Sequence, residues 1–510
     1  MASVVEYATI GNILMIIIFL LIFNQLLVLY QFREMPPGPR LTSLPFIGNL
    51  LSFDSGDSFM EITASLRKKY GKVFSVKIGS FKVVIAGDTA SVKELLVRKS
   101  ADYAGRPPLY SFLRSTFDGK DIAVGNYSPA WKFHRKIFVA AIRRYLSDKQ
   151  VVEKTIAEQA TKLTQYFEDQ NLKDFDPANM LMESIANVSC RILFGKRFDS
   201  SHSDFKELLK LNDDFFSDYE INTQRFILDF FPVAKYFPFR AYQLMNNMLD
   251  QVYEILRRQL KIQERESSNS TEIDSLTGSF LQERAVAENE VGAEERVAFL
   301  SDEYMLSNMR DMFVAGYDTT SSTLRWAIAF LVHHPKIQKE VQNQLDEVVG
   351  KDRVPNLDDL PNLPLVQAMI METQRLGNVA ENTIPHYTLK DTTLAGFRIP
   401  KDTIVFATLA QVHLDPGCWE NPYSFNPHRH IDADGQLITN TGNFLPFSAG
   451  RRVCAGEALA KVELFLFLTW MLHKFTFLPS EEGTVPDLKG HTGLTHFPAL
   501  YKIRAKKRLR

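Results

Sequence analysis

The sequence is poor in cysteine and has no excess of charge of either sign. Its 510 residues include three cysteines, Cys190, Cys418 and Cys454, and no two of them have the C-x-x-C spacing. An odd, sparse set argues against a disulfide framework and against a zinc finger, and it indicates a reducing compartment. The formal net charge of -1 creates no field that would attract nucleic acid, so we expect no nucleic-acid partner.

The N-terminus lacks charge almost completely, because Glu6 is the one charged residue among the first 32. Residues 13–30 are nearly all apolar, and 18 residues are about the minimum that crosses a hydrocarbon core. A cleaved signal peptide is the alternative, but no basic segment precedes the apolar run and no A-x-A-like site follows it. Arg33 and Arg40 flank its far end, which predicts a cytosolic body. We expect residues 1–32 to form a single-pass membrane anchor.

The rest of the chain is predicted to be one large, mainly helical domain. Prolines 36, 37 and 39 predict a stiff hinge over residues 33–45. Alternating apolar residues on both sides of Gly79-Ser80 predict a hairpin over residues 73–87. No internal repeat or second boundary divides residues 46–510, so the expected fold is mainly α with small β-sheets. Helices are expected near residues 130–144, 150–169, 178–193, 204–219, 241–265, 301–334, 365–376 and 457–473, with a polar surface loop over 266–300.

Two of these helices carry unusual residues. Residues 301–334 would make a helix of about 45–50 Å, long enough to cross a domain. Its segment 315–323 is rich in glycine, threonine and serine, which weaken a helix and indicate either a packing kink or a groove for a small ligand. In the helix near 365–376, Glu372 and Arg375 share one face and are able to pair.

The segment Phe447–Gly456 carries the strongest chemical signal. Its glycines allow tight turns, and Cys454 lies at the entrance of the helix predicted from Glu457. Free N–H groups at a helix start, together with the nearby cation Arg452, favour a thiolate. A cysteine that only fills space in a core needs neither feature, so this pattern predicts a thiolate that binds a metal.

This segment fits the signature F-x-x-G-x-R-x-C-x-G of the cytochrome P450 superfamily at every fixed position. The family's other motifs are present in the same order: the 315–319 groove, Glu372-x-x-Arg375, and Phe425 to Arg429. With the anchor, the proline hinge and Trp131-x-x-x-Arg135, the resemblance covers essentially the whole chain. The chain is similar to the microsomal animal type, which includes steroid 17-alpha-hydroxylase and the xenobiotic-oxidising families.

The resemblance implies a haem b (iron protoporphyrin IX) whose iron is bound by Cys454. Glu372, Arg375 and Arg429 would form a structural ion-pair triad under the cysteine segment. Asp318 and Thr319 would deliver protons to bound oxygen through water. The residues that the resemblance assigns to contact with the haem are Cys454, Phe447, Arg452, Trp131, Arg135, Arg106, His386 and Ala315.

The implied activity is insertion of one atom of O2 into a lipophilic substrate, whether steroid, lipid or xenobiotic. Electrons would come from NADPH through cytochrome P450 reductase at the endoplasmic reticulum membrane, and cytochrome b5 is a further candidate partner. Lys136, Arg143, Arg144 and Lys461 form either a docking face for such a partner or an ordinary solvated surface. The six cations in the last ten residues are expected to form a solvated tail that touches membrane lipid.

Two departures from the family pattern leave alternatives open. His428 stands where relatives usually have a glutamate, and residues 381–383 (Glu-Asn-Thr) are unusually polar. These polar side chains either turn outward or offer hydrogen bonds to a polar group of the substrate. Two other functions also remain: a haem-thiolate isomerase or dehydratase that acts on hydroperoxides, which Thr319 disfavours, and a non-catalytic haem or steroid binding protein.

Overall fold

The structure is a computed structural model. It describes all residues except 1, 54–58, 199–200, 218–226, 232–234, 237–238, 268–273, 440–441, 494 and 509–510. The described helices are α1 (Ala2–Gln31), α2 (Phe59–Tyr70), α3 (Thr89–Lys93), α4 (Tyr110–Ser115), α5 (Pro129–Ser147), α6 (Lys149–Asp169), α7 (Ala178–Phe194), α8 (Ser203–Ser217), α10 (Arg240–Ser267), α11 (Leu276–Glu288), α12 (Glu294–Phe299), α13 (Asp302–His333), α14 (Pro335–Val348), α15 (Pro364–Gly377), α16 (Leu409–His413) and α17 (Glu457–Lys474).

Small sheets accompany these helices, as the sequence predicted. The largest has the strand order β1-β2-β6-β3, in which β2 and β6 run parallel and the other neighbours antiparallel. The described strands are β1 (Val73–Ile78), β2 (Phe81–Ala86), β3 (His386–Tyr387), β4 (Thr392–Leu394), β5 (Phe397–Ile399), β6 (Ile404–Ala407), β7 (Phe475–Leu478), β8 (His491–Thr492), β9 (His496–Phe497) and β10 (Arg504–Lys507).

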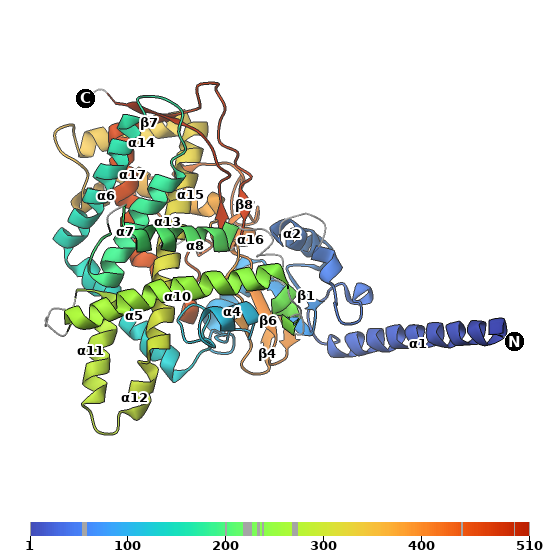
Figure 1. The fold of residues 1–510 in the computed structure, drawn as a ribbon. Coiled ribbons are helices and arrows are strands. Elements are labelled where there is room, and N and C mark those ends of the chain that lie inside the picture. The colour runs from blue at the N-terminus through green and yellow to red at the C-terminus, as the bar shows by residue number, and fades with distance from the viewer. Residues whose placement is uncertain are drawn as a thin grey trace.

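Helix α13 is the central element of the helical part and packs against α7, α15 and α17 (Figure 1). It ends at His333, and Pro335 then occupies the first turn of α14, where a proline costs no hydrogen bond. A Cβ on Gly316 would lie 2.5 Å from the hydroxyl oxygen of Ser189 on α7. This glycine therefore serves close packing of two helices, which was one of the two expected explanations for the weak segment.

Helix α1 projects from the body of the molecule, and its last turn is part of the body (Figure 1). Residues 12–31 are apolar and long enough to cross a membrane, with a mean hydropathy of 2.7. Val28 and Phe32 are nevertheless buried in the apolar cluster beside β2 and β6. The proline segment also contacts the sheet, because the Ser75 N–H donates to the carbonyl of Pro37 at 2.8 Å. The anchor is thus fixed directly to the sheet.

Two expectations about polar segments were wrong. Residues 266–300 were predicted as a surface loop, but they contain α11 and α12, and Leu276 and Phe280 of α11 are buried. The cationic C-terminus was predicted as a solvated tail, but Arg504–Lys507 forms β10, which pairs antiparallel with β7. In both segments a few apolar side chains face the core while the many charged ones stay in solvent.

Candidate functional site

Cys454 lies three residues before α17, at the helix entrance that the sequence predicted. Its N–H donates to the carbonyl of Phe447 at 3.0 Å, which closes the segment into a loop. Gly450 has a φ of +72°, and a Cβ there would overlap the carbonyl of Leu96, so the loop requires glycine at this position. The Cys454 side chain is exposed. The loop therefore presents its sulfur instead of burying it in the core.

The protein alone does not make Cys454 a thiolate. Desolvation raises the pKa of the thiol, while the N–H groups of Gly456 and Glu457 and the Arg135 guanidinium lower it only in part. The sequence analysis named Arg452 as the nearby cation, but the structure gives that place to Arg135, which donates to the carbonyl of Val453. A bound metal ion deprotonates a coordinating thiol outright, so a metal would supply the missing stabilisation.

The central helix presents the oxygen-activation residues in a particular way. Ala315 is exposed although it lies in the middle of α13. Thr319 donates its hydroxyl to the carbonyl of Ala315 at 2.8 Å. Asp318 instead accepts from the hydroxyl of Thr495, next to β9, at 2.8 Å. Adjacent residues of a helix do not face each other, so Thr495 is the hydroxyl bonded to the acid, and the sequence analysis missed it because it lies 177 residues away.

Asp318 is held in an environment that favours its protonated form. Burial raises the pKa of its carboxyl group, the hydrogen bond from Thr495 lowers it, and the negative charge of Asp213 raises it further. A carboxyl group whose pKa lies above the ordinary aspartate range is better able to release and regain a proton near neutral pH.

Arg106, His386 and Arg452, here called the Arg452 cluster, come together from three distant segments. Arg452 donates through Nε and Nη2 to the carbonyl of Ala104 at 2.9 and 2.7 Å, but its Nη1 is buried and has no partner among the described residues. His386 Nδ1 bonds to the carbonyl of Tyr103 at 2.7 Å, and its Nε2 is also buried and unpaired in the described part.

The charges of the Arg452 cluster disfavour one another. Burial lowers the pKa of Arg452 to about 8 and that of Arg106 to about 10. Burial, with the positive charges of Arg106 and Arg452, lowers the pKa of His386 to about 3. The described residues form no salt bridge to either arginine under a 4 Å limit. A carboxylate ligand would relieve both the unpaired donors and the repulsion.

Trp131 and Arg135 stand one turn apart on α5, beside the Arg452 cluster. The guanidinium of Arg452 lies 4.2 Å from the centre of the Trp131 ring, and that of Arg135 lies 5.5 Å from it. The indole N–H of Trp131 donates to the carbonyl of Ile122 at 2.9 Å, so that donor is already engaged. Their assignment to the haem remains a prediction, as it does for Phe447 and Ala315.

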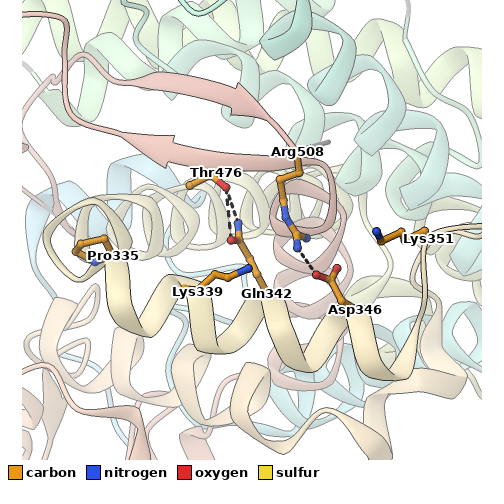
Figure 2. A pocket seen from close by; sticks show the side chains of 7 residues that line it. All are labelled: Pro335, Lys339, Gln342, Asp346, Lys351, Thr476 and Arg508. Carbon is orange, nitrogen blue, oxygen red and sulfur yellow. Dashed lines mark hydrogen bonds and ion pairs between the residues drawn. The ribbon is translucent and has the colours of Figure 1, made fainter. Parts of the chain in front are cut away.

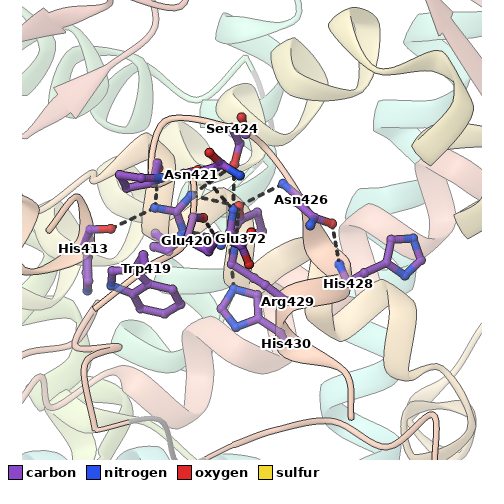
Figure 3. A network of polar contacts seen from close by, with 12 residues as sticks. Glu372, His413, Trp419, Glu420, Asn421, Ser424, Asn426, His428, Arg429 and His430 are labelled. Atoms are coloured by element: carbon purple, nitrogen blue, oxygen red, sulfur yellow. Dashed lines mark hydrogen bonds and ion pairs between the residues drawn. The ribbon is translucent and has the colours of Figure 1, made fainter. Parts of the chain in front are cut away.

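A second group of charged residues, the Glu372 cluster, supports the segment that precedes the cysteine loop (Figure 3). Glu372 is fully buried and accepts two hydrogen bonds from Arg375, at 2.8 and 2.9 Å, and one from Arg429 at 3.0 Å. His430 Nε2 also bonds to Glu372 at 3.0 Å. Burial alone would raise the pKa of Glu372, but Arg375 and His430 outweigh it and bring it to about 2.

His413 extends the Glu372 cluster toward the cysteine loop. Its carbonyl accepts from Arg375 at 2.8 Å, and its Nε2 accepts from the N–H of Leu445 at 2.9 Å. Its Nδ1 therefore carries the proton and donates to Asn378, which ends α15 with a φ of +42°. Sequence reasoning missed both His413 and His430, because a lone histidine in an apolar helix or turn carries no distinctive pattern.

The two departures from the family pattern have separate structural settings. His428 is exposed and lies 2.9 Å from Glu340 on α14. Thr383 is paired with Ala407 of β6 through both its N–H and its hydroxyl. Glu381 is half-buried, and burial raises the pKa of its carboxyl group. One oxygen each of Glu381 and Asn382 is buried without a partner in the described part, so these side chains do not simply turn out to solvent.

A surface pocket of about 420 Å³ lies elsewhere, between α14 and the strands β7 and β10 (Figure 2). Asp346 and Arg508 pair across it at 2.5 Å, and Gln342 bonds to Thr476 at 3.1 Å. None of the predicted site residues lines it. Its lining residues are Pro335, Lys339, Gln342, Asp346, Lys351, Thr476 and Arg508.

The sequence profile of the cytochrome P450 family matches residues 36–505, so the chain belongs to that family. It is 34% identical to steroid 17-alpha-hydroxylase/17,20 lyase of Oryzias latipes over 499 residues, which cover 97% of this chain and 96% of the relative. It is 33% identical to cytochrome P450 2U1 of Mus musculus over 450 residues, 87% of this chain and 82% of the relative.

A solved structure agrees with this assignment. A zebrafish cytochrome P450 described as a complex with progesterone superimposes with a TM-score of 0.77 at 30% identity, and the match covers 88% of this chain and all of that one. The chain is accordingly a cytochrome P450 monooxygenase, and its family implies a haem. The residues present fit that group, since an exposed cysteine and unpaired buried donors on Arg452 and His386 match a metal and carboxylates.

Proposed function

We propose that this protein inserts one atom of O2 into a lipophilic substrate, using a haem b whose axial ligand is Cys454. The observation that carries the proposal is the loop that holds Cys454 at the start of α17 with its side chain exposed. A bound haem supplies the iron at which O2 is activated, and a thiolate ligand favours cleavage of the O–O bond. Every other role in the proposal belongs to residues of this chain.

Arg452, His386, Arg106 and Arg135 hold the two carboxylates of the haem. Charge-assisted hydrogen bonds suit this task, and the unpaired nitrogens of Arg452 and His386 are the available donors. Protons reach the oxygen site from Asp318 by way of Thr495 or water, and the Thr319 hydroxyl donates at that site. Thr319 must break its bond to the Ala315 carbonyl to do so, which a helix readily allows.

Electrons come from NADPH through a flavoprotein reductase, with cytochrome b5 as a second donor. Lys136, Arg143 and Arg144 are exposed along α5 and form the cationic surface proposed for docking. The apolar helix α1 anchors the protein in the endoplasmic reticulum membrane, and the catalytic body faces the cytosol. Its fixed attachment to the sheet through Val28 and Phe32 keeps the body close to the lipid from which a lipophilic substrate arrives.

The substrate is proposed to be a steroid-like lipid that carries a hydrogen-bond donor. The relatives named for steroid hydroxylation and the progesterone complex support a steroid framework. The buried, unpaired oxygens of Glu381 and Asn382 support a donor on the substrate, such as a hydroxyl group. A panel of sterols with and without hydroxyl groups, scored by spectral shift on binding, tests this point, and equal affinity for both sets would contradict it.

Replacement of Thr319 tests the reaction class. With NADPH and reductase, we expect Thr319→Ala to lower product formation about 100-fold while NADPH consumption continues, because proton delivery fails. The matched Thr319→Ser retains the hydroxyl and should keep most of the activity. Turnover with a hydroperoxide but none with NADPH and reductase would contradict the proposal and favour an isomerase or dehydratase. Spectral shifts without any product would favour a binding protein.

A further inference from the structure

The loop of residues 119–126, between α4 and α5, touches three of the residues assigned to the haem. Three of its backbone carbonyls accept hydrogen bonds from them, so the position of the loop and the orientation of these donors are coupled. The pairs are Trp131 Nε1 to Ile122 at 2.9 Å, Arg106 Nε to Ala123 at 2.9 Å, and Arg452 Nη2 to Gly125 at 2.8 Å.

Two carboxyl groups hold the N–H side of the same loop. The N–H of Ala123 donates both to Asp121 Oδ2 and to Asp311 Oδ2, at 3.1 Å each. The N–H of Val124 donates to Asp121 Oδ2 at 2.9 Å. Asp121 belongs to the loop and is 3% exposed, whereas Asp311 belongs to α13 and is partly buried. The loop is therefore attached to the central helix through a pair of acids.

The two acids also hydrogen-bond to each other. Two ionised carboxylates have no hydrogen to donate, so this contact requires a proton on one of them. Burial raises the pKa of Asp311 well above its ordinary value, and Asp121 raises it further. Burial also raises the pKa of Asp121.

The charged and titratable groups around the pair come from four other places in the fold. Arg310, the neighbour of Asp311 on α13, lowers the pKa of both acids. Tyr253 of α10 faces the pair and donates its hydroxyl to the carbonyl of Ser115. Arg106 and Arg452 act on Asp121 from the other side of the loop. These three cations favour one negative charge on the pair, and the contact between the acids still requires one proton.

We propose that Asp121 and Asp311 share one proton and form a positioning pair, which clamps the 119–126 loop to α13 and thereby orients the three haem-contacting donors. The proposal rests on the assignment of those donors to the haem and adds a control of the same site by pH. The proton acts as the link between loop and helix, because its loss leaves two adjacent negative charges that repel each other.

The direction of the pH effect follows from the raised pKa values. An aspartate in the open loop ionises near pH 3.9, whereas the closed pair retains its proton to a higher pH. The closed state therefore binds more protons than the open state, so closure is favoured in acid and weakens as the pH rises through the raised pKa. Asp121→Asn removes one ionisable group, and its amide is able to donate to Asp311 at every pH.

Amide hydrogen exchange of Ala123 and Val124 tests the clamp in the full-length, haem-loaded protein. Protection is expressed relative to an unstructured peptide at the same pH, from about pH 5 to about pH 9, a range in which an ordinary aspartate stays ionised. We expect protection in the wild type to fall at least about tenfold across this range, the equivalent of one unit of pKa. Asp121→Asn should keep its protection nearly constant.

A matched control is Asp229→Asn, since Asp229 is buried and accepts from the N–H and hydroxyl of Ser111. This variant should follow the wild-type pH profile at Ala123 and Val124. Flat protection in the wild type, or an Asp121→Asn variant that follows the wild type, would overturn the proposal. The carbon monoxide spectrum of the same samples reports on Cys454 separately, so an intact thiolate spectrum with a flat profile would reject the clamp alone.

Discussion

The Glu372 cluster and the Arg452 cluster are both buried and rich in cations, but only one of them contains its anion. In the Glu372 cluster a carboxylate accepts from two arginines and a histidine, and every partner comes from the chain itself. In the Arg452 cluster the arginines donate only to backbone carbonyls, and one nitrogen of Arg452 and one of His386 have no partner among the described residues.

The ionisation of the two clusters shows the same contrast. Despite its burial, Glu372 has a pKa of about 2, so its charge is stabilised by the fold. Burial lowers the pKa of Arg452 to about 8, so its charge is destabilised until an anion binds. Burying unpaired donors and like charges costs free energy, and a protein retains such a site where a ligand compensates for the cost. The first cluster therefore serves stability and the second serves ligand binding.

Removing the carboxylate of the Glu372 cluster should have the largest effect. Glu372→Ala leaves two buried arginines without their partner, and we expect a loss of about 3–5 kcal/mol in the free energy of unfolding. The variant is measured by chemical denaturation, with exposed Glu340→Ala as control. The Glu372 contribution is complete above about pH 4.5 and is lost as the pH falls through about 2, because its pKa is lowered in the folded state. An effect below about 1 kcal/mol would contradict the contrast.

In the Arg452 cluster the effect should fall on the haem. Arg452→Ala removes the unpaired donor, and we expect haem affinity to fall about 10- to 100-fold, the value of one charge-assisted hydrogen bond. Haem titration followed by absorbance measures this loss. Arg451→Ala is the matched control, since that neighbouring arginine is exposed and bonds to the Tyr127 hydroxyl. Equal affinities in the two variants would sink the assignment.

His386 should change the number of protons exchanged when haem binds. Its Nδ1–H donates to the Tyr103 carbonyl, so Nε2 is able to donate to a carboxylate only in the protonated ring. Haem binding is expected to raise the low pKa of His386 and take up a proton, which offsets the proton that Cys454 releases. Calorimetry in buffers of different ionisation enthalpy should show greater net proton release for His386→Gln. An unchanged count would show that His386 does not contact the carboxylates.

The smallest effect is expected at His428, on the exposed edge of the Glu372 cluster. Its contact with Glu340 is solvated on both sides, and such pairs contribute about 0–1 kcal/mol. His428→Ala should therefore change the free energy of unfolding by less than about 1 kcal/mol, with no change in haem content. A loss comparable to that of Glu372→Ala would mean that the cluster extends to the surface.

Local patterns in the sequence predicted most of the fold. The central helix was expected over residues 301–334 and spans Asp302–His333, and the hairpin expected over 73–87 is formed by β1 and β2. These elements have long apolar periodicity or clear turn residues. Helix α11 was missed because its segment is mostly polar, although Ser275 caps it and Leu276 and Phe280 share one face. That spacing was a usable signal.

The partners within the site were much less predictable. The Glu372–Arg375 pair was foreseen because its spacing on a helix is fixed. Thr495, which bonds to Asp318, and the Asp121–Asp311 pair depend on contacts between distant segments. Gly316 was uncertain for a related reason, since its role depends on Ser189 of another helix. Residue types and spacing indicate the chemistry, while the tertiary fold determines which groups meet.

The carbon monoxide difference spectrum of the reduced protein tests the central claim that Cys454 binds the haem iron through its thiolate. The wild type and Cys418→Ser should both give the thiolate-type spectrum, because Cys418 lies away from the loop and contacts Thr89. Cys454→Ser should lose that spectrum even where haem is retained. A thiolate-type spectrum in Cys454→Ser would contradict the account.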